Sequence, residues 1–141
     1  YRTPLFNGIM YSEGGLSRDE TELAATAASV LNKCIYCAAV HASRFNQITK
    51  TENVMSAIFD GTPEKTLTTR QRMIFEFATK LSATPSKASP EDAQSLIDSG
   101  LSRLEIFDVI LSASIFGWAN RLMHILGEPM EVFHEKNNFI T

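Results

Sequence analysis

Apolar residues recur along much of this chain at intervals of three and four, the spacing of one face of an α-helix. Over residues 69–81 this spacing predicts a long helix, which Thr68 or Thr69 can cap. Its apolar face is formed by Met73, Ile74, Phe77, Ala78 and Leu81. The alanine-rich stretch 21–31 contains no helix breaker and is also expected to be helical. No segment shows the alternation typical of a half-buried strand, so the pattern predicts an all-α fold.

Caps and breakers set the ends of the first two predicted helices. Ser17 can cap the first helix, and Glu20 lies at the position of a capping box. Asn32 and Lys33 should interrupt it, because Asn tolerates the left-handed conformation that ends helices. A second helix is then expected from about residue 34 to about residue 47. Residues 1–15, which contain Pro4 and three glycines, are interpreted as an irregular arm.

Similar signals predict the later helices. One is expected at about 53–59, one from Pro90 to Gly100, and one from about 101 to 126 that Gly127 and Pro129 end. The tail, 130–141, has no clear pattern. Leu-Ser-Arg opens both the helix at 16–18 and the helix at 101–103. We therefore expect a single domain over residues 1–141, built as a helical bundle with two loosely similar halves.

Composition narrows the classes of function. The chain has 141 residues, a formal net charge of −3 and a pI near 5.6, which disfavours nucleic-acid binding. No apolar run approaches the ~20 residues of a membrane span, and no signal peptide is visible. The chain opens on Tyr1 rather than methionine, which leaves room for an upstream segment. We expect neither nucleic acid nor membrane as a partner, and a cytoplasmic location.

The candidate chemistry lies in Cys34-Ile-Tyr-Cys37, which holds the two cysteines of the chain, and in His41 four residues later. On a helix, these spacings place both thiols and the imidazole on one face. The first turn of that helix is also where the helix dipole should lower a thiol pKa. A disulfide closing so small a loop adds little stability, so the pair is interpreted as redox-active.

Peroxide reduction needs a nucleophilic thiolate, a base and a second thiol that closes a disulfide. Cys37 and His41 can supply the nucleophile and the base, and Cys34 the resolving thiol. Glu22 is the carboxylate chosen to orient His41, since a chain reversal at residues 32–33 would bring the two helices together. Glu20 is the competing carboxylate, but the capping box gives it another role.

The run from Glu22 to His41 resembles the alkylhydroperoxidase AhpD-like branch of the carboxymuconolactone decarboxylase superfamily, and looks most like its "peroxidase-related" members. The shared pattern is Glu, eleven residues, Cys-x-x-Cys, three residues, His. The resemblance extends more loosely through residues 69–81, 90–92, 100–102 and 120–122.

The resemblance implies an all-helical peroxidase that works through a cysteine pair and a Glu–His–Cys proton relay. Cys37 would form the sulfenic acid and Cys34 would resolve it. It also implies a homo-oligomer, often a trimer or hexamer. Tyr36 stands where AhpD itself has a further histidine, and it can donate a proton or line the pocket.

We therefore expect a thiol-dependent peroxidase that takes a peroxide substrate and an external dithiol or protein reductant, with no cofactor and no metal. Three alternatives stay open: a general thiol–disulfide oxidoreductase, a carboxymuconolactone decarboxylase-like enzyme, and a non-enzymatic metal-binding helical module. Zinc would need His124 or His134 besides Cys34, Cys37 and His41. No Walker or dinucleotide motif is present, so standard NAD or ATP binding is not expected.

Overall fold

The computed structural model describes residues 2–127 and confirms the all-α class, because these residues form helices and no strand. The elements are α1 (Arg2–Tyr11), α2 (Arg18–Leu31), α3 (Ile35–Thr49), α4 (Val54–Phe59), the short 3₁₀ helix η1 (Pro63–Lys65), α5 (Thr69–Ser82), α6 (Pro90–Asp98) and α7 (Arg103–Leu126). The predicted tail 130–141, and Pro129, lie outside the described residues.

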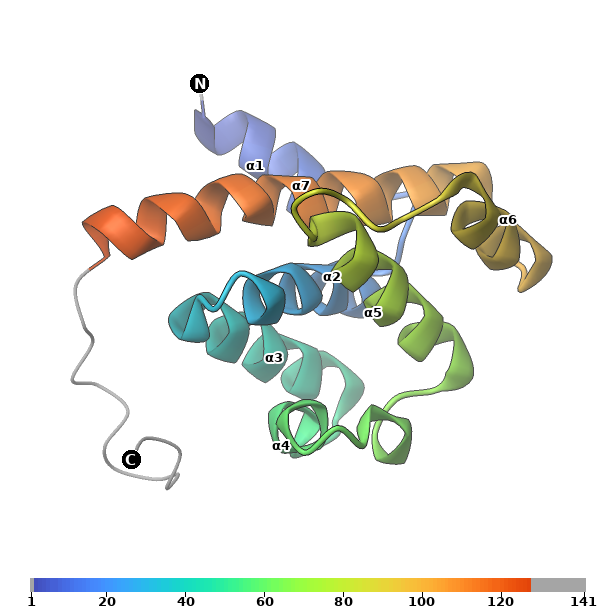
Figure 1. The fold of residues 1–141 in the computed structure, drawn as a ribbon, viewed down its shortest axis with the longest axis horizontal. Coiled ribbons are helices and arrows are strands. Elements are labelled where there is room, and N and C mark those ends of the chain that lie inside the picture. The colour runs from blue at the N-terminus through green and yellow to red at the C-terminus, as the bar shows by residue number, and fades with distance from the viewer. Residues whose placement is uncertain (1, 128–141) are drawn as a thin grey trace.

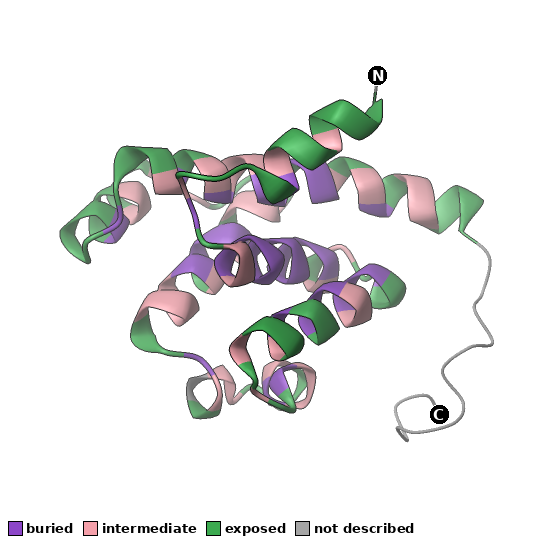
Figure 2. Cartoon of the chain, turned by 180° about the vertical axis from the view of Figure 1, so that it is seen from behind, coloured by how far each residue is buried: buried purple, intermediate pink, exposed green. Residues whose placement is uncertain are grey.

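Helix α2 is the centre of the fold (Figure 1), in contact with α3, α5 and α7. Ten consecutive residues, 20–29, are buried, and Figure 2 shows the buried positions gathered on this central helix. Four of the ten are alanines, at positions 24, 25, 27 and 28, and none of these is exposed. Their small side chains allow neighbouring helices to approach α2 from several sides, which a one-faced amphipathic helix would not permit.

The chain reverses between α2 and α3 as the sequence predicts. The left-handed residue is Lys33, with φ of 60°, and not the predicted Asn32, whose φ is −77°. The Cys34 amide donates to the Ser29 carbonyl at 2.9 Å. Cys34 is then the N-cap of α3, and its carbonyl accepts the first helical hydrogen bond, from Ala38. This turn returns α3 along α2 and places both cysteines at the start of α3.

Capping boxes form at the starts of three helices. Thr68 pairs with Gln71 in α5, Ser89 with Asp92 in α6, and Ser102 with Glu105 in α7. The predicted box at Ser17 is wrong, because the Ser17 side chain accepts no capping hydrogen bond.

Glu20 has a tertiary partner in place of the predicted cap. Arg70 of α5 binds both of its carboxylate oxygens, at 2.6 and 3.1 Å, and also binds Glu105 of α7 at 2.6 Å. Glu20 is buried, so this charged partner is worth more to it than a local backbone amide would be. The three residues tie α2, α5 and α7 together.

The interpretation of residues 1–15 as an irregular arm is also wrong, since α1 occupies Arg2–Tyr11. Pro4 lies in the first turn, where a missing amide hydrogen costs little, and Gly8 is tolerated. Packing supplies the stability: Met10 is 2% exposed, and the Phe6 ring meets the Phe116 ring of α7 edge-on at 5.6 Å. Tertiary contacts therefore outweigh a weak local helix signal.

Helix α7 is long and apolar enough to cross a membrane, since its 24 residues contain an 18-residue window with a mean hydropathy of 1.3, and it is the one such helix between residues 2 and 127. The sequence-based statement that no apolar run approaches this length is therefore wrong. The helix packs on α2 and α5, and Val109, Ala113 and Phe116 belong to the main hydrophobic cluster. A core helix of a folded domain meets the same length and composition test.

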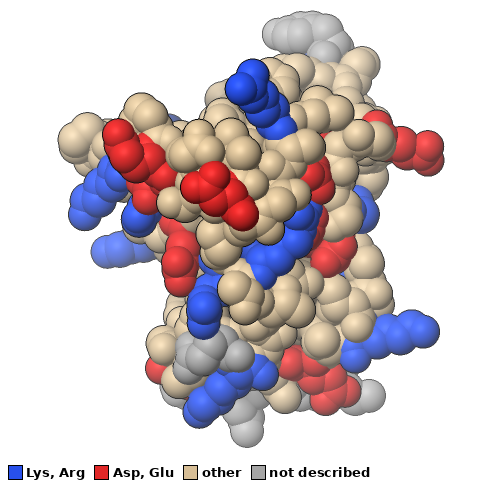
Figure 3. Space-filling model, turned by 90° about the vertical axis from the view of Figure 1, so that its right-hand side faces the viewer, with Lys and Arg blue, Asp and Glu red and all other residues tan. Residues whose placement is uncertain are grey.

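Acidic and basic side chains are interspersed over the face of the molecule shown in Figure 3. That face carries no continuous basic patch of the kind that binds a phosphate backbone.

The docking of α1 can be tested with two substitutions in that helix. Met10→Ala removes a buried side chain and should lower the free energy of unfolding by about 2–5 kcal/mol, measured by urea denaturation. Asn7→Ala is the matched control, because Asn7 is an exposed residue of the same helix and its substitution should change stability by no more than about 0.5 kcal/mol. Equal effects of the two substitutions would contradict the packing of α1 on the core.

Candidate active site

The two cysteines lie side by side at the start of α3. Cys34 is the N-cap and Cys37 belongs to the first turn, so their side chains share one face. The sulfur atoms are 2.8 Å apart, both thiols are free, and each residue is 5% exposed. A disulfide has a sulfur–sulfur bond of about 2.05 Å, so the pair can close with a small movement. The spacing in the sequence thus produces the predicted proximity.

The structure also brings Glu22 to His41, nineteen residues later. His41 Nδ1 donates to Glu22 Oε2, from one helix to the next. Glu22 has no exposed surface and His41 is 7% exposed. The His41 ring also packs edge-on against the Phe116 ring of α7, with centroids 4.2 Å apart. The carboxylate and the phenyl ring together fix the imidazole, which leaves Nε2 as the nitrogen that can take a proton.

Two arginines compensate the second oxygen of Glu22. Arg18 donates to Oε1, and Arg44 lies 3.9 Å from the same oxygen. Arg18 also donates to the Met10 carbonyl and stacks over the Tyr11 ring at 4.0 Å. Sequence reasoning did not select either arginine, although the four-residue step from Arg18 to Glu22 is a recognisable helical ion-pair spacing.

Burial governs the protonation of Cys37. Removal from water, and secondarily the neighbouring Cys34, raise the pKa of the Cys37 thiol from 9.0 to about 12. Hydrogen bonds from the Asn120 side chain and from the Cys37 backbone lower the pKa, but by less. The expectation that the helix dipole would leave a thiol of low pKa is therefore wrong for Cys37. In this conformation the sulfur is protonated at neutral pH, so the site needs a base.

A buried polar network borders the thiols from α7. Asn120 has no exposed surface; its amide nitrogen donates to Ser29 Oγ at 3.1 Å and its oxygen accepts from Asn32 at 3.1 Å. His124 binds the Asn32 carbonyl at 2.8 Å, one turn further along. Sequence reasoning missed this network. The available signal was an Asn within an apolar helix, where an amide is costly unless it is bonded.

Tyr36 lies at the surface, in contrast to the buried pair. It is 40% exposed, and Ile35 beside it is 51% exposed. The Tyr36 hydroxyl makes no hydrogen bond within residues 2–127. Its position at the edge of the site fits a side chain that lines the approach to the thiols.

The zinc alternative lacks a complete ligand set in the part of the chain that the structure describes. No group of three or more His, Cys, Asp or Glu side chains there could hold a metal ion. His124 is engaged with the Asn32 carbonyl, and His134 lies outside the described residues.

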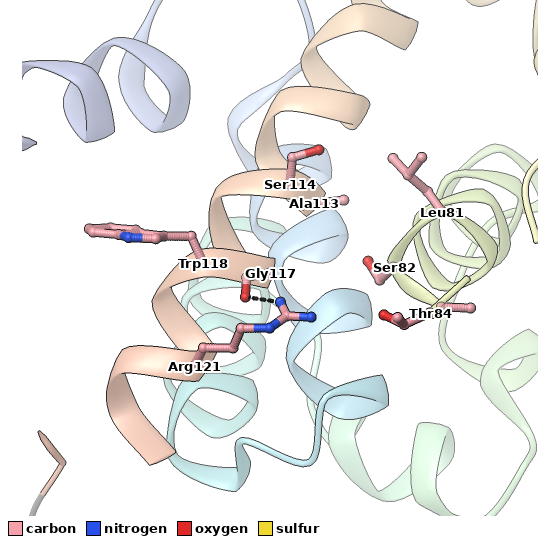
Figure 4. A pocket seen from close by; sticks show the side chains of 9 residues that line it. Leu81, Ser82, Thr84, Ala113, Ser114, Gly117, Trp118 and Arg121 are labelled. Atoms are coloured by element: carbon pink, nitrogen blue, oxygen red, sulfur yellow. Dashed lines mark hydrogen bonds between the residues drawn. The ribbon is translucent and has the colours of Figure 1, made fainter. Parts of the chain in front are cut away.

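Two surface pockets lie on α7, away from the thiols. Figure 4 shows one of about 460 Å³ between α7 and the end of α5, where Arg121 lies across from Ser82 and Thr84. The other, of about 510 Å³, lies between α1 and α7 and is mostly apolar. Neither of these two pockets includes Cys34, Cys37, His41 or Glu22.

Comparison with known proteins places this geometry in context. Residues 1–62, which contain the Glu22–His41 pattern, match the Carboxymuconolactone decarboxylase family. An uncharacterized peroxidase-related protein from Silicibacter sp. TM1040 is 26% identical, with a TM-score of 0.77 over 86% of this chain and 64% of its own. No functionally curated protein matches the chain significantly.

A second solved structure carries the same fold. It is described as an alkylhydroperoxidase AhpD core, an uncharacterized peroxidase-related protein from Ralstonia eutropha JMP134, and is 24% identical. Its TM-score is 0.81 over 92% of this chain and 68% of its own. The chain thus spans about two thirds of the length of both proteins. These matches confirm the resemblance to the AhpD-like and carboxymuconolactone decarboxylase superfamily.

The raised pKa of Cys37 predicts a stability that depends on pH. The folded state holds the thiol proton up to about pH 12, whereas the ordinary value is 9.0. The resulting stabilisation is complete below pH 9 and is lost as the pH rises towards 12. The unfolding free energy of the reduced protein should therefore fall more steeply above pH 9 than that of Cys37→Ala, in urea denaturation at a series of pH values. Parallel curves for the two proteins would contradict the raised pKa.

Proposed function

We propose that this protein is a thiol-dependent peroxidase that reduces a hydroperoxide through Cys34 and Cys37, with His41 and Glu22 as its proton relay. The observation that carries the proposal is the sulfur pair, 2.8 Å apart, one helical turn before an imidazole that a buried carboxylate holds. The peroxidase-related descriptions of the structural neighbours support the same class of reaction.

The first half of the proposed reaction oxidises Cys37. The thiol proton passes to His41 Nε2 while the sulfur attacks the terminal oxygen of the hydroperoxide. The oxygen–oxygen bond breaks, and His41 returns the proton to the leaving oxygen. An alcohol leaves, or water when the substrate is hydrogen peroxide, and Cys37 becomes a sulfenic acid. Glu22 stabilises the imidazolium that exists between the two proton transfers.

The second half closes the disulfide. The Cys34 sulfur attacks the Cys37 sulfur, and the sulfenic oxygen leaves as water with the Cys34 proton. The protein loses two electrons and two protons, which the peroxide has accepted. An external dithiol or a protein reductant then restores both thiols by exchange. A reducing compartment such as the cytoplasm would supply such a reductant.

Burial has a function in this scheme. A Cys37 thiol with a pKa of about 12 stays protonated at rest, and a protonated thiol is a weak nucleophile. Burial therefore makes proton transfer to His41 a requirement for thiolate formation.

Self-association is part of the proposal. The groove between α1 and α7 is apolar, and Leu5 and Trp118 at this groove are 62% and 45% exposed. A second copy of the chain, in a trimer or hexamer, would remove this surface from water. Sedimentation of the purified protein measures the assembly directly.

A general thiol–disulfide oxidoreductase is the second candidate, because the same sulfur pair could exchange with a protein disulfide. Stopped-flow mixing of the reduced enzyme with peroxides and with disulfides separates the two functions. The peroxidase proposal requires that a peroxide oxidise the pair faster than any of the disulfides does.

The two cysteines should differ sharply in substitution. Cys37→Ser is expected to abolish peroxide consumption, since it removes the nucleophile. Cys34→Ser should allow one turnover and leave Cys37 open to over-oxidation, because no thiol remains to resolve the sulfenic acid. Single-turnover kinetics with mass detection of the sulfenic acid test both, and a fully active Cys37→Ser protein would end the proposal.

Glu22→Gln should lower the single-turnover rate about 10- to 1000-fold, because the imidazolium loses its carboxylate while His41 itself remains; loss of a general base itself typically costs about 100- to 10,000-fold. The pH–rate profile should change with it. Glu76→Gln is the control, as the Glu76 side chain is 61% exposed and lies on α5. An unchanged rate and profile in Glu22→Gln would exclude Glu22 from the relay.

A further inference from the structure

The carboxylate of Glu22 is shared between two partners of different charge. Oε2 accepts from His41 Nδ1, and Oε1 accepts from the guanidinium of Arg18, one helical turn before Glu22. Water reaches neither partner of the pair freely, because Glu22 has no exposed surface and His41 is 7% exposed. Each oxygen therefore depends on its protein partner, and the proposed relay uses the partner of only one of them.

Arg18 is itself held in place by the end of α1. Its guanidinium donates to the Met10 carbonyl as well as to Glu22, and it lies over the Tyr11 ring, 4.0 Å from the ring centroid. The Tyr11 hydroxyl accepts from Arg44 of α3 at 3.0 Å, and Arg44 lies 3.9 Å from Glu22 Oε1. A planar guanidinium can meet several such partners at once, since its donors point in fixed directions. Turning away from Oε1 would therefore cost Arg18 its contacts with α1.

The two arginines determine the charge balance around the relay. A buried carboxylate alone beside an imidazole would draw a proton onto the ring, because the opposite charge stabilises the imidazolium. Arg18 and Arg44 bring two positive charges to the same carboxylate and oppose that proton. Arg18 is the more buried of the two, with 29% of its side chain exposed against 45% for Arg44. Its charge is therefore the one that water screens less.

Apart from Arg44, the other ionisable groups around the pair carry no positive charge or are paired among themselves. They are the Cys37 thiol of α3, the Tyr11 phenol of α1, and the ion-paired side chains of Glu20, Arg70 and Glu105 between α2, α5 and α7. From α7 the imidazole meets the Phe116 ring, which has no charge. None of these groups can replace Arg18 as the cation bound to Oε1.

We propose that Arg18 is a positioning residue of the peroxidase: it holds Glu22 Oε1 and offsets the carboxylate charge, so that His41 rests as a neutral imidazole with its hydrogen on Nδ1. Nε2 is then free to take the thiol proton, as the proposed function requires, and the inference rests on that function. Without Arg18, the carboxylate and the imidazole would together take up one proton from water. Nε2 then carries a hydrogen in either form of the pair, imidazolium with carboxylate or neutral imidazole with a carboxylic acid that donates to Nδ1.

Nitrogen-15 NMR of the histidine side chains at neutral pH tests this protonation state without any turnover. The His41 resonances are assigned by their loss in His41→Gln. Nε2 should be unprotonated in the wild-type protein and protonated in Arg18→Met, which has neither charge nor donor. Arg18→Gln still has an amide donor but no charge, and it should give the same result if Arg18→Met does not fold. Arg18→Lys keeps a positive charge and should leave Nε2 unprotonated.

The pH dependence of peroxide reduction should change in the same direction. A base that is protonated at rest needs a higher pH to act, so the rising limb of the single-turnover pH–rate profile should move up by about one pH unit in Arg18→Met. At a pH below that limb the rate should fall about 10-fold, and on the plateau it should approach the wild-type rate. Loss of packing alone would instead lower the rate by a similar factor at every pH.

Arg72→Gln is the matched control. Arg72 also pairs with a glutamate four residues later, Glu76 at 3.8 Å, but this pair is exposed and lies on α5. Its loss should leave the His41 resonances and the pH–rate profile unchanged. Urea denaturation of every variant shows which of them are folded under the conditions of the NMR measurement.

The outcomes separate this proposal from the proposed function. An unprotonated Nε2 in the folded charge-free variants of Arg18, or a protonated Nε2 in the wild-type protein, would overturn the role of Arg18 even if the wild type reduces peroxide. A protonated Nε2 in Arg18→Lys or in Arg72→Gln would also overturn it, because the charge at Oε1 would not be the cause. A protonated Nε2 confined to the charge-free variants, in a protein whose wild type leaves every peroxide unreduced, would overturn the peroxidase and keep Arg18 as the residue that sets the protonation of His41.

Discussion

The carboxylate of Glu22 has no contact with solvent, and much of the site follows from the need to compensate its charge. Burying an unpaired carboxylate costs several kcal/mol, so its partners must be present in the folded state. His41 binds one oxygen and Arg18 the other, with Arg44 close by. These partners come from α2 and α3, and Arg18 reaches on to α1 through the Met10 carbonyl. One buried charge thereby fixes the register of three helices.

The same burial that holds Glu22 also opposes the chemistry of Cys37. A dry site strengthens the His41–Glu22 hydrogen bond, but it raises the pKa of the Cys37 thiol to about 12. In the proposed reaction His41 and Glu22, on α3 and α2, offset this cost by taking the thiol proton. The packing of α3 along α2 is the arrangement that brings these two side chains together.

Local sequence signals predicted the parts of the fold that local interactions stabilise. The predicted cap at Thr68 forms, and the helices predicted from Pro90 and from about residue 101 begin at capping boxes of Ser89 and Ser102, which act within one helical turn. Predictions failed where a distant partner competes. Glu20 gives up its predicted cap for Arg70, fifty residues away, and α1 forms because Met10 and Phe6 pack against α7 and the core. Patterns among residues close together in the sequence carry no information about such long-range contacts.

The chain alone specified the thiol pair, because a three-residue step at a helix start leaves two side chains on one face whatever surrounds them. It also pointed to Glu22, since a two-residue interruption forces two helices to lie side by side. The raised pKa of Cys37 and the hydrogen bonds of Asn120 to Ser29 and Asn32 were decided by the packed fold. A pKa depends on the water excluded and the dipoles brought close by every neighbouring helix, and α7 reaches the turn before Cys34 from more than eighty residues away.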